Sequence, residues 1–209
     1  MKGRSLGSVL AVLGLALGAQ VVTTQVARAD GDIPGVGEDP SGPAYDTESI
    51  YETIGEIFGE ATEVHIRGLG VEIVEIDFSP SLGTSDRDTI GVNSKNSDGE
   101  TVLDIATVAV VVEHEAKHIQ NIRNSLTEAV FDPTTTGVPG METHANMHFE
   151  SIVDALDDYD RCAAVTPETC LALSLNLVAG GRWAERGGLD RPTPEEAEAQ
   201  SYMNECCIF

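Results

Sequence analysis

Between residues 101 and 125 the hydrophobic pattern of the chain changes character. In the stretch 108–112 every residue is apolar, whereas beyond residue 118 apolar and polar residues recur at helical spacing. The apolar stretch alone would also suit a buried strand, but its amphipathic continuation favours a helix. Thr101 with Asp104 is one of two candidate capping boxes at the start. We therefore predict a helix buried in the middle of a domain.

The rest of the pattern predicts a mixed α+β domain. Apolar residues at helical spacing indicate helices on both sides of the buried one, and imperfect alternation indicates short strands before it. The predicted helices are 45–62, 101–125, 141–156, 166–180 and 193–205, and the predicted strands are 63–68, 70–78 and 89–94. We expect a small sheet packed on the buried helix, followed by a mostly helical C-terminal part.

The N-terminus has the three parts of a secretory signal peptide over residues 1–29. Lys2 and Arg4 form the basic start, residues 6–19 the apolar stretch, and residues 27–29 a small-x-small cleavage site. The apolar stretch is too short for a comfortable membrane span, and no later stretch is long enough. We expect a protein that is secreted or held in the periplasm or cell envelope, without stable membrane insertion.

The mature chain is strongly acidic. Residues 1–29 hold three basic residues and no acidic one, so their removal takes the formal charge from −23 to −26. Nucleic acids and anionic membranes are poor partners for such a surface, whereas a basic substrate, adaptation to high salt or simple solubility would suit it. Residues 30–43 predict an acidic flexible tail and 44–209 a single domain. The oligomeric state is not indicated.

All four cysteines lie in the last quarter of the chain, and an even number in an exported protein predicts disulfides. Pairing the first two with the last two would tie the C-terminus to the domain in either of two ways, and a local pairing of neighbours is a third arrangement. The candidates are Cys162, Cys170, Cys206 and Cys207.

The predicted buried helix carries a His-Glu-x-x-His motif. His114 and His118 are four residues apart, so both imidazoles leave the same face of a helix and can bind one Zn²⁺. Glu115 lies about 100° further round the helix. From there its carboxylate can take a proton from a zinc-activated water without binding the metal. The motif predicts a zinc site with Glu115 as the catalytic base.

A catalytic zinc needs a third protein ligand, which we expect on the helix 141–156. Asn121 and Asn124 stand where a metzincin would carry glycine and histidine, so that class is excluded. Glu142 falls within the apolar arc of the helix, where a carboxylate is costly unless it is paired or bound to metal. We predict Glu142 as the third ligand. His144 lies close to the polar side and His148 nearer the border of the apolar arc, so both are interpreted as surface or boundary histidines and rank next.

These residues resemble the gluzincin type of zinc metallopeptidase, which has His-Glu-x-x-His on one helix and Glu-x-x-Ala-Asp on a later one. Glu142 and Ala145 match the second motif, and Asn146 stands in place of the aspartate. The resemblance covers roughly residues 88–160. It implies a compact zincin-like fold, with Asn146 holding a zinc-bound histidine by a hydrogen bond. It also implies that substrate pairs with the strand around Gly91, Val92 and Asn93.

Together these features predict a secreted zinc-dependent peptidase that acts on a peptide or protein substrate. Two other classes remain. One is an exported zinc-binding protein with a zincin-like fold that binds a partner without cutting it. The other is an acidic envelope protein without metal. Zinc content separates the last class from the first two, and proteolysis separates the first two from each other.

Overall fold

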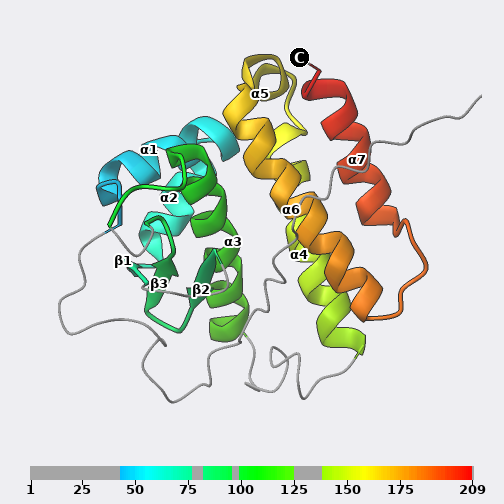
Figure 1. The fold of residues 1–209 in the computed structure, drawn as a ribbon, viewed down its shortest axis with the longest axis horizontal. Helices are drawn as coiled ribbons and strands as arrows, with labels where there is room; N and C mark the ends of the chain where they lie inside the picture. The colour runs from blue at the N-terminus through cyan, green and yellow to red at the C-terminus, as the bar shows by residue number, and fades with distance from the viewer. Residues whose placement is uncertain (1–42, 77–81, 96–98, 125–137, 209) are drawn as a thin grey trace, which may run out of the picture.

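The computed structural model describes residues 43–76, 82–95, 99–124 and 138–208, and over these ranges the chain forms seven helices and one small sheet (Figure 1). The predicted signal peptide and nearly all of the acidic tail lie outside the described residues. The elements are α1 (Thr47–Phe58), α2 (Glu60–Gly68), β1 (Glu72–Glu75), β2 (Gly83–Ser85), β3 (Thr89–Val92), α3 (Ile105–Asn124), α4 (Val138–Leu156), α5 (Tyr159–Ala164), α6 (Pro167–Arg186) and α7 (Pro194–Cys206). The predicted α+β class is confirmed, with helix predominating.

The predicted strand 63–68 is wrong, because this segment is helix α2. Gly59, with φ +90°, ends α1 and lets the chain turn directly into α2. Within α2, the Arg67 guanidinium binds the Glu63 carboxylate one turn earlier, at 2.8 Å. Such a pair supports a helix and has no counterpart in an alternating strand.

The sheet has the strand order β1-β3-β2, with β1 parallel and β2 antiparallel to the central strand β3. Gly91 pairs with Val74 on one side and Thr84 on the other, and the Asn93 N–H donates to the carbonyl of Leu82. Both edges of β3 are therefore occupied. The expectation that a substrate strand pairs at Gly91, Val92 and Asn93 needs correction, since an added strand requires a free edge. The sheet edge next to α3 is β2.

Helix α3 confirms the predicted helix over the ambiguous valine stretch. Asp104 caps it, because its carboxylate accepts the Thr107 N–H at 2.7 Å. Val108, Ala109 and Val112 are fully buried. The helix packs against α1, β2, β3, α4 and α6. Cover on every side explains why its first half is apolar all round.

The C-terminal helices form a second layer beside α3, with α4 packed on α6 and α7 (Figure 1). Gly180 of α6 lies against the Phe149 ring of α4, so close that an added Cβ would come within 2.6 Å of a ring carbon. Two disulfides, Cys162–Cys206 and Cys170–Cys207, bind α5 and the first turn of α6 to the end of α7. They are one of the two crossed pairings left open by the sequence. Among the described residues, no helix is long and apolar enough to cross a membrane.

Candidate metal centre

The two histidines of the α3 motif lie at chelating distance. The Nε2 atoms of His114 and His118 are 3.2 Å apart, and the ring planes are nearly perpendicular, at 88°. Two imidazoles that bind a tetrahedral zinc at about 2.0–2.1 Å have nitrogen atoms about 3.3 Å apart. The helix alone therefore brings this pair to the separation that a zinc ion requires.

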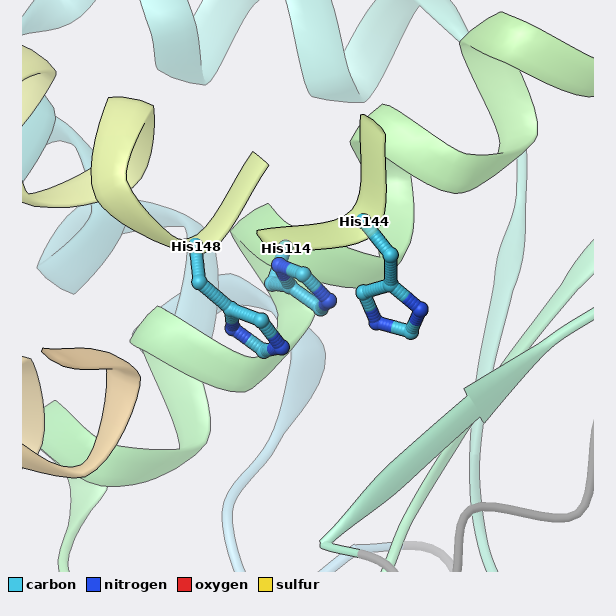
Figure 2. Close-up of side chains that lie close together, drawn as sticks. All are labelled: His114, His144 and His148. Carbon is cyan, nitrogen blue, oxygen red and sulfur yellow. The ribbon is translucent and has the colours of Figure 1, made fainter. Parts of the chain in front are cut away.

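Helix α4 adds two more histidines to the same place. His144 and His148 are buried next to His114, and a ligand atom of each of these three side chains lies within 4.8 Å of the others (Figure 2). Three buried imidazoles so placed can hold a metal ion. The i, i+4 spacing of His144 and His148 was visible in the sequence, but the surface that covers them was not.

That covering surface belongs to α6. The Trp183 ring stacks on His144, with centroids 4.4 Å apart and planes 18° apart. Asn176 lies against His148, and its Oδ1 is 3.1 Å from the His148 Nδ1. An amide oxygen only accepts, so the His148 Nδ1 carries the proton and the lone pair of Nε2 is available to a metal. A partner of this kind fixes both the tautomer and the orientation of a ligand.

Centroid distances place the His144 ring near both histidines of the α3 pair. Imidazoles around one tetrahedral zinc have centroids about 5.2 Å apart, given a Zn–N distance of about 2.0–2.1 Å. The His144 centroid is 5.4 Å from that of His114 and 4.7 Å from that of His118. His148 instead stacks face to face on His114, at 3.9 Å and 7°. The three histidines whose ligand atoms lie close to one another are His114, His144 and His148, and His118 adjoins them through the contact of its Nε2 with that of His114.

Unpartnered and uncharged nitrogens make this cluster fit a cation. The His114 Nδ1 is buried and has no hydrogen-bond partner among the described residues. Burial lowers the pKa of His118 to about 4 and that of His148 to about 3, and it holds the pKa of His114 and His144 well below the usual range. Neighbouring imidazoles add to the effect at His114 and His144. All four rings are therefore neutral at pH 7, the form that binds metal.

Glu115 leaves α3 toward the sheet, where it meets the edge strand β2. Ser85 Oγ donates to its Oε2 at 2.7 Å, and Gly83 is so close that an added Cβ would lie 3.0 Å from its Oε1. Burial raises the pKa of Glu115 to about 7, and the Ser85 hydrogen bond limits the rise. A carboxylate with this pKa can both take up and release a proton near neutral pH, as general acid–base work requires.

The other residues predicted for the site do not contact the histidine cluster as expected. Glu142 is exposed on α4 and is not part of the buried group. The Asn146 Oδ1 is buried without a hydrogen-bond partner among the described residues, whereas the amide that does contact a site histidine is that of Asn176. Asn176, Ser85 and Trp183 were missed, because nothing local in the sequence links them to the motif.

A buried ion-pair network fixes α3 against α4 beside the histidines. Lys117 contacts the Glu113 carboxylate at 2.9 Å and the Asp154 carboxylate at 2.7 Å, and Ser151 donates to Glu113 at 2.6 Å. Glu113 and Ser151 are almost completely buried. These contacts link the two helices that supply the histidines, so they fix the relative position of the two halves of the site.

Comparison with known proteins gives no relative: no family model, no curated protein and no solved structure matches this chain. Function is therefore inferred from the geometry and chemistry of the histidine cluster.

Proposed function

We propose that the protein is an exported zinc-dependent peptidase whose active site is the histidine cluster between α3 and α4. One observation carries the proposal: a pair of imidazoles at zinc-chelating distance lies on the same helix as a buried carboxylate whose pKa is raised to about 7. Metal ligands alone occur in both structural and catalytic sites. Hydrolysis also needs a general base, and a carboxylate with a pKa near neutrality, next to a ligand in the chain, can serve as one.

In this proposal His114, His118 and His144 bind the zinc. His144 takes the place that the sequence suggested for Glu142, because it is buried in the cluster and Glu142 is exposed. When bound, zinc lowers the pKa of a water molecule and polarises the scissile carbonyl. Glu115 accepts the proton of the attacking water and then passes it to the leaving amine. Ser85 holds the Glu115 carboxylate through its hydrogen bond.

The two disulfides support an oxidising location for the mature chain, in agreement with the predicted signal peptide. Zinc also fits this chemistry, because it is redox-inactive and accepts an all-imidazole ligand set.

The decisive experiment compares Glu115→Gln with the wild type for zinc content and hydrolysis of an unstructured protein substrate. We expect Glu115→Gln to keep one zinc per chain and to lose at least 100-fold in kcat, since general acid–base catalysis typically supplies about 10²–10⁴-fold. Glu150→Gln, an exposed position on α4, is the matched control. Full activity in Glu115→Gln would refute the mechanism.

A second candidate function is favoured by His148. Four neutral imidazoles can fill all four positions of a tetrahedral zinc, and a closed site of this kind is structural. The protein would then bind a partner without cutting it. Stoichiometric zinc in the wild type with no hydrolysis of any substrate would favour this function, and the absence of zinc would leave an acidic envelope protein.

A further inference from the structure

Most of the few basic side chains of this acidic protein have partners within the molecule. Of the 12 lysines and arginines, three lie in residues 1–29, which leaves nine in the mature chain. Seven of these nine make ion pairs or other contacts within the molecule: Arg67, Arg87, Lys95, Lys117, Arg123, Arg161 and Arg191. Arg182 and Arg186 are the exceptions, since neither has a carboxylate partner among the described residues and both are exposed.

These two arginines lie one turn apart on α6, so they share one face of the helix. Trp183 lies between them in the sequence, and the Arg186 guanidinium is 5.1 Å from the centre of its ring. The same ring stacks on His144. Arg186 is thus connected to the histidine cluster through a single buried aromatic side chain, and Arg182 lies one turn before it on the same helix. A cation in the last turn of a helix is favourable by itself, but this does not account for Arg182 one turn earlier.

We propose that Arg182 and Arg186 form a subsite for a carboxylate of the substrate, beside the metal centre. The inference rests on the proposed function, and it names the substrate class: peptides that carry an anionic group close to the scissile bond. In a chain with formal charge −26, anionic groups are repelled almost everywhere, so one cationic spot next to the site determines the position of the carboxylate. Guanidinium groups are suited to carboxylates because their planar donors match both oxygens.

The ring contacts limit how far the carboxylate lies from the scissile bond. Arg186 is 5.1 Å from the Trp183 ring centre, which is 4.4 Å from the His144 centroid, and a metal lies about 3 Å beyond that centroid. An extended peptide advances about 3.3–3.6 Å per residue. The carboxylate is therefore within about four residues of the bond that is cut, either at the C-terminus or on a side chain.

Trp183 supplies the readout, because it is the only tryptophan in the chain. The zinc-loaded Glu115→Gln variant is titrated with four matched peptides while Trp183 fluorescence is recorded. The peptides have a C-terminal carboxylate or amide, combined with glutamate or glutamine at the third position from the end. We expect the peptides with a carboxylate to bind roughly three- to tenfold more tightly, as befits partly exposed charge pairs. A preference that follows the C-terminal carboxylate identifies the C-terminus as the bound group, and one that follows the glutamate identifies the side chain.

The same titrations are repeated with Arg182→Gln/Arg186→Gln added. We expect the preference to disappear there, and to persist in Arg182→Lys/Arg186→Lys and in the control Arg67→Gln, which removes a distant charge. Equal preference in the glutamine variant, or no preference with the arginines intact, would overturn the subsite. Because binding is measured without turnover, a clear carboxylate preference in a protein that never hydrolyses peptides would refute the peptidase proposal and leave the subsite standing.

Discussion

Helices α3 and α4 each contribute two histidines with the same i, i+4 spacing to one cluster. Only the α3 pair can be recognised from the sequence as metal ligands. On α3, the intervening Glu115 and the apolar surroundings mark His114 and His118 as a site. On α4, His144 and His148 stand between polar and apolar positions and resemble surface residues. Their environment comes from Trp183 and Asn176 on α6, far along the chain. A metal-binding motif can be recognised in a sequence when its ligands and their surroundings are set by one helix. The α3 histidines meet this condition, and the α4 histidines do not.

The two regions that carry these helices are also stabilised differently. Around α3, contacts are non-covalent: the buried Glu75 carboxylate accepts the backbone N–H groups of Ser94 and Lys95, at 2.7 and 2.9 Å, and thereby ties β1 to the segment after β3. Around α4, two disulfides connect α5 and the first turn of α6 with the end of α7. We expect the stability of the α3 region to depend on its buried core and that of the α4 region on its disulfides.

The largest effect is expected from removing either histidine pair. His114→Ala/His118→Ala and His144→Ala/His148→Ala should each abolish stoichiometric zinc binding and lower hydrolysis by at least 100-fold, because a catalytic zinc needs three protein ligands. Metal analysis of the purified proteins is the measurement. Full zinc content in the α4 variant would return the third-ligand role to Glu142, and Glu142→Ala is the companion variant that would then lose zinc.

The next largest effect is expected from removing a disulfide, which should destabilise the α4 region more than the α3 region. Each closes a loop of about 40 residues, for which the chain-entropy estimate is about 4 kcal/mol of unfolding free energy. Cys170→Ala/Cys207→Ala should lower the urea midpoint, and hydrogen exchange should show protection lost in α6 and α7 before α3. Zinc affinity in the folded state should change little. Equal loss of protection throughout α3 would show that the two regions unfold as one unit.

Acid should destabilise the metal-free protein through the histidines. Burial lowers the pKa of all four, to about 4 for His118 and about 3 for His148, below the ordinary histidine value of about 6.5. Below pH 6.5 the unfolded chain therefore binds protons that the folded chain does not, and stability falls toward the folded-state pKa values. Glu113 and Glu115 have raised pKa values and act in the opposite direction. Four histidines outweigh two carboxylates, so the net loss is about 2–3 kcal/mol per pH unit near pH 5.5.

A variant isolates the histidine contribution. His144→Gln/His148→Gln should reduce the pH dependence of the unfolding free energy, because the unfolded variant takes up as many as about two fewer protons than the unfolded wild type. Urea unfolding at pH 5.0, 5.5, 6.0 and 6.5, followed by Trp183 fluorescence, measures that free energy. The metal-free state is maintained with a chelator. An unchanged slope would mean that the α4 histidines titrate alike in the folded and unfolded chains, which contradicts their burial.

The sequence predicted the fold where periodicity determines structure and failed where distant contacts do. Helices α3, α4, α6 and α7 followed from the sequence, whereas the short helix α5 was not predicted. The segment 63–68 was predicted as a strand because it was read without the break at Gly59 and the Glu63–Arg67 pair. At the site, Glu142 fell in the apolar arc of α4 and yet is exposed. His144 and His148, taken as boundary histidines, are covered by Trp183 and Asn176 of α6, and a helical projection contains no information about that packing.

The smallest expected effect tests the packing that brings α6 over the α4 histidines. Gly180→Ala would place a Cβ within 2.6 Å of the fully buried Phe149 ring, one residue after His148. Because that ring has no free space, overpacking should cost about 1–3 kcal/mol of unfolding free energy. Urea unfolding measures the cost, and Gly68→Ala, where an added Cβ meets nothing within 4 Å, is the control. If α6 fixes the site, Gly180→Ala should also weaken zinc binding and shift Trp183 emission, whereas equal stability and affinity in both variants would mean that α4 holds its histidines without α6.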